Sequence, residues 1–503
     1  MAGEYLIGVD IGTQGTKTVL FDLEGKCLAE AFKKSSLYRP SAGVVEEDPE
    51  KQLSSVCQTI KQCIKDCKVD QTAIAAIGLD GQTAGIIGID KNGKNITPYD
   101  SWLDTRCAPY IQQMADVAGD EILSKTGWSP SFNHGPKKLW WKYKQPKIYK
   151  QIASFVQPAG YAALRLCGLD SSKAFIDRTY LHFSGFADNR KNKWDLELCK
   201  IFDFDPDKLP AIVEPEKIVG QLTTAMAKRC GLRAGVPVVA GCGDTAASFI
   251  ACGAVKKGIC VDVAGTASVF AATTDKFKAD IKNKTLGCAQ AAVKGLWHPY
   301  AYINGGGMNL EWFKNELMNP ESKSTQQITF DKLNTLAEKL SVEEDLPYFV
   351  PHFGGRVCPP VPGLRGAWVN LNWNHKIEHL YKAILESVAL EYGIYHQILK
   401  SLYPEMKVKE VRNTGGGGNS VLWNTIKSAV LQAPIVQIVK NQGAPMGSAM
   451  LAGTGVGLFN DLQEVAAQWI KTGASIKATA KEKKIYQQKI DYYKKLLDVL
   501  AHI

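Results

Sequence analysis

Two short apolar runs separated by a glycine-rich turn open the chain. The first run, residues 5–9, leads into the segment Asp10-Ile11-Gly12-Thr13-Gln14-Gly15-Thr16-Lys17, and a second run at 18–21 follows at once. Short apolar runs bounded by turn residues are typical of buried strands. The pattern therefore predicts a strand–turn–strand hairpin, not the strand–turn–helix of a dinucleotide or P-loop site.

A helix and a further strand are predicted behind this hairpin. Asp48 is a candidate N-cap and Pro49 suits the first helical position. Apolar residues then recur at helical spacing at Leu53, Val56, Ile60 and Ile64. The next apolar run, Ile74 to Leu79, predicts a strand that ends at Asp80-Gly81-Gln82.

The second half of the chain repeats the opening pattern. An apolar run at 258–261 meets Asp262-Val263-Ala264-Gly265-Thr266, and a second run follows at 268–271. Two similar hairpins about 250 residues apart indicate two related α/β domains that face a shared cleft. A chance likeness between short Gly-Thr turns is the alternative.

The end of the chain has the pattern of an amphipathic helix with lysines on its polar face. Its apolar stripe consists of Tyr486, Ile490, Tyr493, Leu497 and Leu500. Such a helix can lie on a membrane surface, but docking on its own domain is the more common outcome.

Composition places the chain among globular proteins. It has 503 residues, 45% hydrophobic and 22% charged, which suits two large domains or three smaller ones and excludes wholesale disorder. The net charge of +10 is spread over mixed surfaces and does not favour nucleic acid. No apolar run is long enough to span a membrane, and no signal peptide is evident. The 13 cysteines form no C-x-x-C pair, so we expect thiols in a reducing cytoplasm.

Four glycine-rich turns are candidates for holding a nucleotide. A phosphate needs converging backbone N–H groups with no Cβ in the way, together with hydroxyl donors. Residues 12–17 and Gly265-Thr266 supply both, and Lys17 can add a positive charge. The turns at 305–307 and 415–419 are richer in glycine, and Asn419 can contact a purine or ribose. Together the four turns favour a nucleotide cleft over plain loops.

Three acids beside these turns are candidates for chemistry. Asp10 and Asp262 lie at strand ends, where a carboxylate can hold Mg²⁺ or cap its own turn. We assign the metal role to Asp10 and the turn role to Asp262. Asp244 lies among small residues in Gly241-Cys242-Gly243-Asp244-Thr245, which leaves room for a substrate. It is the candidate general base, a role compatible with that of a helix cap.

These motifs together resemble the FGGY family of carbohydrate kinases, nearly from end to end. Residues 10–17 are similar to the family's Asp-x-Gly-Thr loop, Gly241 to Asp244 to its catalytic Gly-x-Gly-Asp, and Gly265-Thr266 to its second phosphate turn. The turn at 415–419 resembles the adenosine turn, and 307–313 is similar to another nucleotide-side element. Local departures are Asn370, where the family prefers Gly, and Gly135, where it has Pro, Ser or Thr.

The resemblance implies a fold and a reaction. The fold is α/β, with two ribonuclease-H-like domains of the actin and hexokinase ATPase type around a central cleft. Residues 1–250 would hold the sugar, the catalytic Asp and the first phosphate loop, and residues 251–503 the nucleotide. The reaction is transfer of a phosphoryl group from ATP, with Mg²⁺, to a hydroxyl of a small sugar or polyol. Because family members are often dimers, the resemblance also allows a homodimer.

The resemblance also implies a set of site residues. Asp244 would be catalytic and Asp10 would position the metal. The residues expected at the nucleotide are Thr13, Gln14, Thr16, Lys17, Gly265, Thr266, Gly307, Gly415, Gly416 and Asn419. The residues expected at the acceptor are Gln82, Thr83, Ala84, Trp102, Asp104, Asp244 and Thr245. For Trp102 a place in the core, and for Asp104 a bond to Arg106, are the alternatives.

Within the family the chain is most like xylulokinases. Gln82-Thr83-Ala84-Gly85 stands where xylulokinases have Gln-Met-His-Gly and glycerol kinases have Gln-Arg-Glu. The missing His removes a donor to the ketose, and Thr245 replaces the more common Asn or Gln. D-xylulose or a related ketose is the first expectation. A tetritol or pentitol, another ketose, an aldonate and glycerol stay open, as does a non-catalytic relative that binds sugar or ATP.

Overall fold

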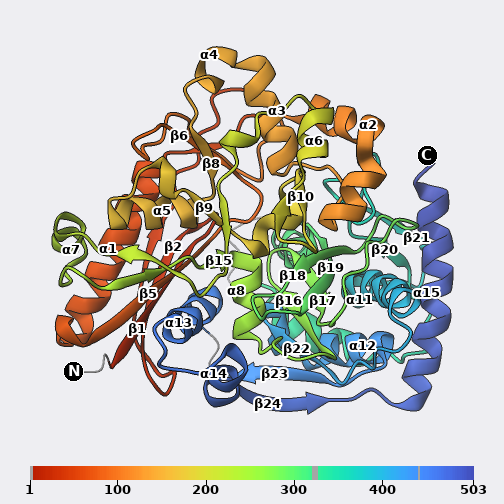
Figure 1. Cartoon of the computed structure of the whole chain (residues 1–503). Coiled ribbons are helices and arrows are strands. Elements are labelled where there is room, and N and C mark those ends of the chain that lie inside the picture. The colour runs from red at the N-terminus through yellow and green to blue at the C-terminus, as the bar shows by residue number, and fades with distance from the viewer. Residues whose placement is uncertain (1–3, 320–326, 440–441, 503) are drawn as a thin grey trace.

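Two large sheets form the framework of the protein (Figure 1). The computed structural model describes residues 4–319, 327–439 and 442–502. The N-terminal sheet has seven strands, with β15 pairing beside β5. In order across the sheet, its strands are β13 (Ile218–Gln221), β14 (Pro237–Val239), β5 (Ile74–Gly81), β1 (Tyr5–Ile11), β2 (Gly15–Asp22) and β3 (Cys27–Lys34), with β15 (Cys242–Gly243).

The C-terminal sheet also has seven strands. In order they are β18 (Gly287–Gln290), β19 (Trp297–Ile303), β17 (Ser268–Ala272), β16 (Ile259–Ala264), β22 (Glu410–Thr414), β23 (Ile435–Val439) and β24 (Lys471–Ile476).

Both predicted hairpins are present and have the same surroundings. β1 pairs antiparallel with β2, and β16 pairs antiparallel with β17. On its other edge, β1 pairs parallel with β5, and β16 pairs parallel with β22. The likeness between the two halves is therefore structural, and the chance alternative is excluded.

Helices cover both faces of the N-terminal sheet. α1 (Pro49–Cys67), capped by Asp48 as predicted, packs on β2 and β3 with α5 (Pro158–Cys167) and α7 (Thr224–Cys230) nearby. α13 (Ala444–Gly455) and α8 (Asp244–Ala251) cover the opposite face, so a segment from the end of the chain completes the first half (Figure 1). A Cβ on Gly8 would lie 1.8 Å from the Pro445 carbonyl oxygen, which is why this strand needs glycine there.

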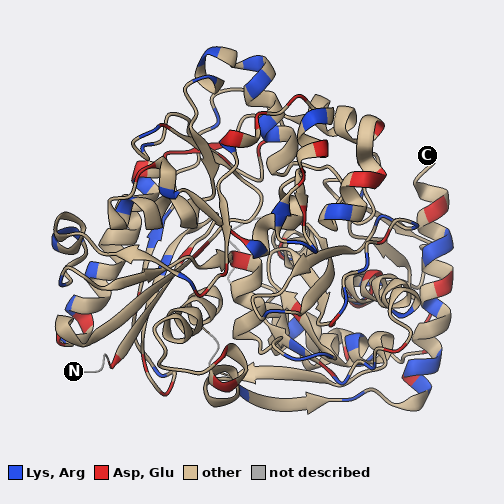
Figure 2. Ribbon diagram, viewed as in Figure 1, with Lys and Arg blue, Asp and Glu red and all other residues tan. Residues whose placement is uncertain are grey.

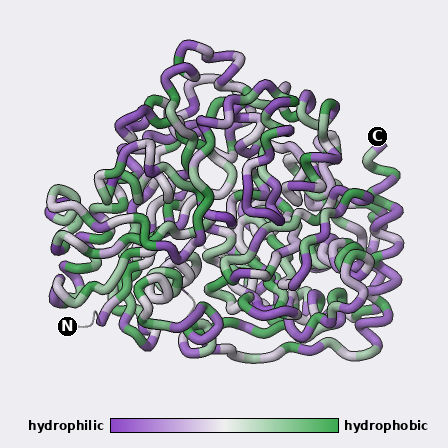
Figure 3. The backbone as a smooth tube through the Cα atoms, viewed as in Figure 1, coloured by the Kyte–Doolittle hydropathy of each residue, from purple (hydrophilic) through white to green (hydrophobic). Residues whose placement is uncertain are grey.

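α11 (Ile377–Leu402) and α12 (Val421–Leu431) pack on the C-terminal sheet, and α15 (Ala480–Leu500) packs on these two helices. α15 docks on α11 and α12 through Tyr486, Ile490, Tyr493 and Leu497, which confirms the predicted docking. Lysines and acids alternate on its outer side (Figure 2), and hydrophilic and hydrophobic residues alternate along it (Figure 3). None of the helices in the described ranges is long and apolar enough to cross a membrane.

The remaining elements form loops and small sheets around this framework. The strands are β4 (Glu46–Glu47), β6 (Ile87–Ile89), β7 (Tyr99–Asp100), β8 (Ser154–Val156), β9 (Phe175–Asp177), β10 (Ala187–Asp188), β11 (Lys193–Trp194), β12 (Ala211–Val213), β20 (Tyr348–Val350) and β21 (Ala367–Val369). The helices are α2 (Ala108–Thr126), α3 (His134–Lys144), α4 (Pro146–Tyr149), α6 (Leu196–Ile201), α9 (Gly306–Trp312), α10 (Phe330–Ala337) and α14 (Leu462–Trp469). Short 3₁₀ or π turns occupy Gln71–Ala73, Ser171–Lys173, Arg178–Phe183, Pro206–Lys208, Phe313–Met318 and Gly416–Asn419.

Candidate active site

Three carboxylates converge at the ends of neighbouring strands. Asp10 of β1 stands opposite Asp80 of β5 in the parallel register, and Asp80 in turn stands opposite Cys242 of β15. Asp244 follows β15 directly as the first residue of α8. The ends of parallel strands meet at one edge of a sheet, so this topology brings the acids together.

The surroundings of Asp10 and Asp80 leave negative charge without compensation. Burial and the charge of Asp244 raise the pKa of Asp10 to about 7, although hydrogen bonding with Asp80 and the charge of Lys17 oppose the rise. Burial and the charge of Asp10 raise the pKa of Asp80 well above its usual range. The Ser448 hydroxyl donates to Asp80 Oδ2 at 2.6 Å. Asp10 Oδ1 and Asp80 Oδ1 are buried with no hydrogen-bond partner among the described residues.

Unpartnered carboxylate oxygens of this kind suit a hard cation. Among the described residues, no group of three or more His, Cys, Asp and Glu side chains could hold a metal on its own. Mg²⁺ in proteins keeps several waters and takes one or two carboxylates plus substrate phosphates. The donor set at Asp10 therefore fits Mg²⁺ with water and phosphate as further ligands.

Asp244 is held through one of its two carboxylate oxygens. Oδ1 accepts from the Thr83 hydroxyl at 2.5 Å, from the Thr245 backbone N–H at 2.6 Å and from the Thr245 hydroxyl at 3.1 Å. Burial raises the pKa of Asp244, and these hydrogen bonds oppose the rise. Within the described residues no hydrogen bond reaches Oδ2, so this oxygen is the one available to a substrate.

Several residues expected at the acceptor form one hydrogen-bonded chain. Trp102 Nε1 donates to Thr13 Oγ1 at 2.8 Å, and Thr13 donates to Gln82 Oε1 at 3.1 Å. Gln82 Nε2 donates to Glu47 Oε1 at 2.8 Å. Trp102 is 38% exposed, so this side chain does not lie in the hydrophobic core, which was the alternative to a place at the acceptor. Thr13, expected at the phosphates, thus also contacts the acceptor residues.

Asp104 forms the bond to Arg106 that was the alternative to contact with an acceptor. Its carboxylate is fully buried and accepts from Arg106 Nε at 2.8 and 2.9 Å and from the Val45 backbone N–H at 2.8 Å. Ala84 packs against the hydrophobic core of the C-terminal half.

The residues of the first glycine turn face different ways. Lys17 lies on the same face of the sheet as Asp10, where it donates to Gln442 at 3.1 Å and pairs with Glu30 at 3.0 Å. The Thr16 side chain lies on the other face, against α1, and is 3% exposed. Gln14 is exposed. The Thr16 hydroxyl is therefore separated from the acids by the sheet.

The glycine turns of the second half come together. The Gly307 N–H donates to the Gly265 carbonyl at 3.0 Å, and the Met308 N–H donates to the Thr266 carbonyl at 3.1 Å. Gly415, with φ of 90°, lies so close that a Cβ there would be 2.6 Å from the Ala264 carbonyl oxygen. Gly416 has open space where its Cβ would be, and Asn419 is exposed and accepts from Gln437. This open, glycine-lined surface fits a flat ring and phosphates.

The predicted turn-capping role of Asp262 is wrong. Its carboxylate is fully buried, pairs with Lys427 Nζ at 2.5 Å and accepts from the Tyr392 hydroxyl at 2.9 Å. The reason is that Asp262 sits inside β16 and faces α11 and α12, which the sequence pattern of the hairpin did not include.

Sequence reasoning did not single out Asp80, Ser448 or Glu47 as site residues. It also omitted His134, whose Nε2 lies 2.7 Å from the Thr83 carbonyl oxygen, and the residues that enclose a small cavity beside Asp244. That cavity is lined in part by Thr179, His182, Gln290 and Tyr300. A signal was available for Asp80, because a strand ending in Asp-Gly repeats the pattern at Asp10.

Comparison with known proteins shows to which family the chain belongs. The model of the FGGY family of carbohydrate kinases, N-terminal domain, matches residues 5–251, and that of its C-terminal domain matches residues 260–456. The chain belongs to the FGGY family of carbohydrate kinases. The predicted family and enzyme class are thereby confirmed.

The similar proteins are named for more than one acceptor. The chain is 26% identical to a xylulose kinase of Bacillus subtilis (strain 168) over 98% of this chain and 96% of that protein. It is 24% identical to a gluconokinase of the same organism over 92% and 90%. A crystal structure of gluconate kinase from Lactobacillus acidophilus superposes with a TM-score of 0.89 at 25% identity, covering 99% of this chain and 98% of that one. A ligand-bound xylulose kinase from that organism gives the same values. The predicted two-domain α/β kinase fold is confirmed.

Proposed function

We propose that this carbohydrate kinase transfers the γ-phosphoryl group of ATP to a hydroxyl of a small sugar or polyol, with Asp244 as the general base. The main observation in support of this proposal is the position of Asp244. Its Oδ1 is held by Thr83 and Thr245, while Oδ2 stays available beside the other two acids. A carboxylate with a raised pKa accepts a proton better than one in water.

The proton transfer follows from this geometry. The attacking hydroxyl gives its proton to Asp244 Oδ2 as its oxygen bonds to the γ-phosphorus and the ADP oxygen leaves. Thr83 and Thr245 hold the carboxylate so that Oδ2 keeps one direction. Exclusion of water from this end of the sheets would prevent hydrolysis of ATP.

The nucleotide is assigned to the glycine turns. Thr13, Gln14 and Lys17, with the backbone of Thr16, would hold phosphates from the N-terminal side, and Gly265, Thr266 and Gly307 from the C-terminal side. Gly415, Gly416 and Asn419 would hold adenosine. Asp10 would position Mg²⁺, and the bound ion would neutralise charge on the phosphates.

For the acceptor we propose D-xylulose or a related ketose first. The xylulose kinases among the relatives support this choice. Gluconate is the second candidate, because a gluconokinase and a gluconate kinase structure are similar to the chain to nearly the same degree. Gln82, Thr83, Trp102 and Thr245 would contact the acceptor, and a changed hydrogen-bonding group can alter acceptor preference by 10⁴ or more.

An acceptor panel tests the proposal. Purified protein with ATP and Mg²⁺ is assayed for ADP release with D-xylulose, other ketoses, pentitols, tetritols, gluconate and glycerol, with Asp244→Asn as the control. Acceptor-dependent ADP release from one class, lost in Asp244→Asn, supports the assignment. ATP binding without release from any acceptor would instead favour a non-catalytic relative.

We also propose the division at residues 250 and 251, a cytoplasmic location and a homodimer. α13 belongs to the second half by sequence but lies on the N-terminal sheet, so separately expressed halves should need each other to fold. Light scattering of the intact chain tests the dimer, and a monomeric mass would contradict it.

A further inference from the structure

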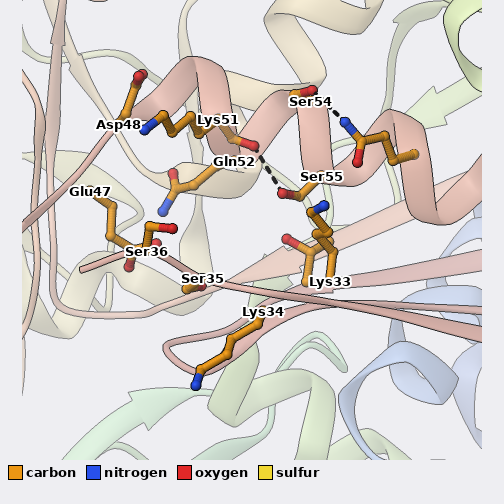
Figure 4. A pocket seen from close by; sticks show the side chains of 12 residues that line it. Lys33, Lys34, Ser35, Ser36, Glu47, Asp48, Lys51, Gln52, Ser54 and Ser55 are labelled. Carbon is orange, nitrogen blue, oxygen red and sulfur yellow. Dashed lines mark hydrogen bonds between the residues drawn. The ribbon is translucent and has the colours of Figure 1, made fainter. Parts of the chain in front are cut away.

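A second cavity lies behind the first glycine turn, on the α1 face of the N-terminal sheet (Figure 4). Its volume is about 160 Å³. At about 30 Å³ for each water, it has room for roughly five waters, the size of a short polyol that carries a phosphate. Its lining consists of hydroxyl, amide and amine groups from β2, β3, the residues after β3 and the first half of α1, together with the carboxylates of Glu47 and Asp48. It is separated from Asp10 and Asp80 by the sheet.

The floor of the cavity contains a buried amide that lies beside the Glu47 carboxylate but forms no well-aligned hydrogen bond among the described residues. Gln52 is 7% exposed, and neither its Nε2 nor its Oε1 is aligned with a hydrogen-bond partner in the described part of the chain. Leaving such a group unsatisfied costs about 1–3 kcal/mol. Because an amide offers one acceptor and a donor side by side, a hydroxyl, which both donates and accepts, is the group that satisfies it best.

The rim of the cavity supplies a cation without a partner. Lys33 lies on the same face of the hairpin as Thr16, and its side chain runs toward Ser55 of α1 (Figure 4). No ion pair or hydrogen bond engages its amine within residues 4–319, 327–439 and 442–502. Lys51, nearby on α1, donates to the Tyr38 hydroxyl.

The acids at the cavity oppose an anion only weakly. Asp48 Oδ1 is engaged by the Glu50 backbone N–H at 2.9 Å as the cap of α1. Burial raises the pKa of Glu47, although the neighbouring amides of Gln82 and Gln52 and the Ser35 hydroxyl moderate the rise. The N-terminal end of α1 adds a partial positive charge.

Two connections join the cavity to the active site. Ser35, which lines it, donates its N–H to the Gln14 carbonyl at 2.9 Å and its hydroxyl to the Gly12 carbonyl at 3.4 Å. Glu47, also in the lining, accepts from Gln82, the residue linked to Thr13 and Trp102. A ligand that moves Ser35 or Glu47 would therefore act on the phosphate turn and on the acceptor residues directly.

We propose that this cavity is a second ligand site for a small phosphorylated polyol, with Lys33 binding the phosphate and Gln52 a hydroxyl. Occupancy changes acceptor affinity through Glu47 and Gln82, and this coupling rests on the function proposed above.

Isothermal titration calorimetry of the full chain with racemic glycerol 3-phosphate tests the site, with glycerol and inorganic phosphate titrated separately. We expect glycerol 3-phosphate to bind more tightly than either fragment. Lys33→Ala and Gln52→Leu should each weaken binding about tenfold. Lys65→Ala, an exposed lysine of α1 outside the cavity, and Asp244→Asn should leave it unchanged. No binding, binding that survives both cavity variants, binding lost in Asp244→Asn, or phosphate alone binding as tightly would each overturn the proposal.

Kinetics test the coupling. Glycerol 3-phosphate at a concentration near its Kd for the native protein should change the KM for the acceptor at least twofold there and much less in Lys33→Ala. Binding without a change in KM contradicts the coupling. If no acceptor in the panel is phosphorylated, the proposed function fails while the calorimetric result on the cavity still stands.

Discussion

The two hairpins of the protein share a backbone and a sequence pattern, but their acids have opposite surroundings. Asp10 in the N-terminal hairpin has a buried oxygen with no partner among the described residues and lies near two further carboxylates. Asp262 in the C-terminal hairpin is neutralised by a buried lysine 2.5 Å away. The first arrangement destabilises the ionised state, whereas the second stabilises it.

This difference indicates that the same hairpin has a chemical role in the N-terminal half and a structural role in the C-terminal half. A cluster of uncompensated acids is costly unless it binds a cation or does proton chemistry. A buried ion pair with both partners present holds helices to a sheet and leaves no charge for a ligand. Substitutions in the first hairpin region should therefore affect turnover, and substitutions in the second should affect folding.

The largest expected effect is on turnover at the N-terminal cluster. Asp244→Asn keeps the hydrogen bond from the Thr245 N–H but removes the proton acceptor, so kcat should fall by roughly 10²–10⁴-fold. Steady-state kinetics with the best acceptor measure this, and equilibrium titration with ATP should show nearly unchanged binding. Near-native turnover would remove Asp244 from the role of base.

The next effect is on stability at the C-terminal hairpin. Lys427→Met leaves the Asp262 carboxylate buried without its cation and should lower the free energy of unfolding by about 3–5 kcal/mol. Denaturant unfolding measures the loss. The double variant Asp262→Asn/Lys427→Met removes both charges and should recover much of it. If the single variant is as stable as the native protein, the two hairpins do not differ in the way described.

The contrast also shows what could be predicted from the sequence. Strands, the α1 cap, both hairpins and Asp244 follow from local patterns, because each depends on neighbours within a few residues. The partner of Asp262 lies 165 residues away, and the Ser448 that holds Asp80 lies 368 residues away. Contacts at such separations depend on how the elements pack, so the ion pair was missed. The face on which Thr16 lies could have been deduced from strand alternation around Lys17.

An effect on stability of at most similar size, but of opposite sign to that at Lys427, is expected at Asp10. The folded chain holds the Asp10 proton up to about pH 7, while the unfolded chain releases it near pH 4. This group therefore costs stability increasingly as pH rises from 4 to 7. Asp10→Asn should raise the free energy of unfolding by up to about 4 kcal/mol at pH 8 and by less than about 1 kcal/mol at pH 4. Denaturant unfolding at both pH values measures this, and a loss of stability at pH 8 would contradict it.

The smallest expected effect is on the pKa of Asp244. Thr83→Val removes a hydroxyl that donates to Oδ1 and so favours the ionised carboxylate. Loss of this hydrogen bond should raise the pKa of Asp244 further, because the Thr83 hydroxyl opposes the rise caused by burial. Since the protonated carboxyl cannot act as a base, the acid limb of the kcat/KM profile should move to higher pH while the plateau above it changes less. Thr59→Ala, which removes a buried hydroxyl on α1, provides the control and should leave the limb in place. A limb that stays fixed in Thr83→Val would mean that another group sets it, and Asp10 would then be the first carboxylate to examine.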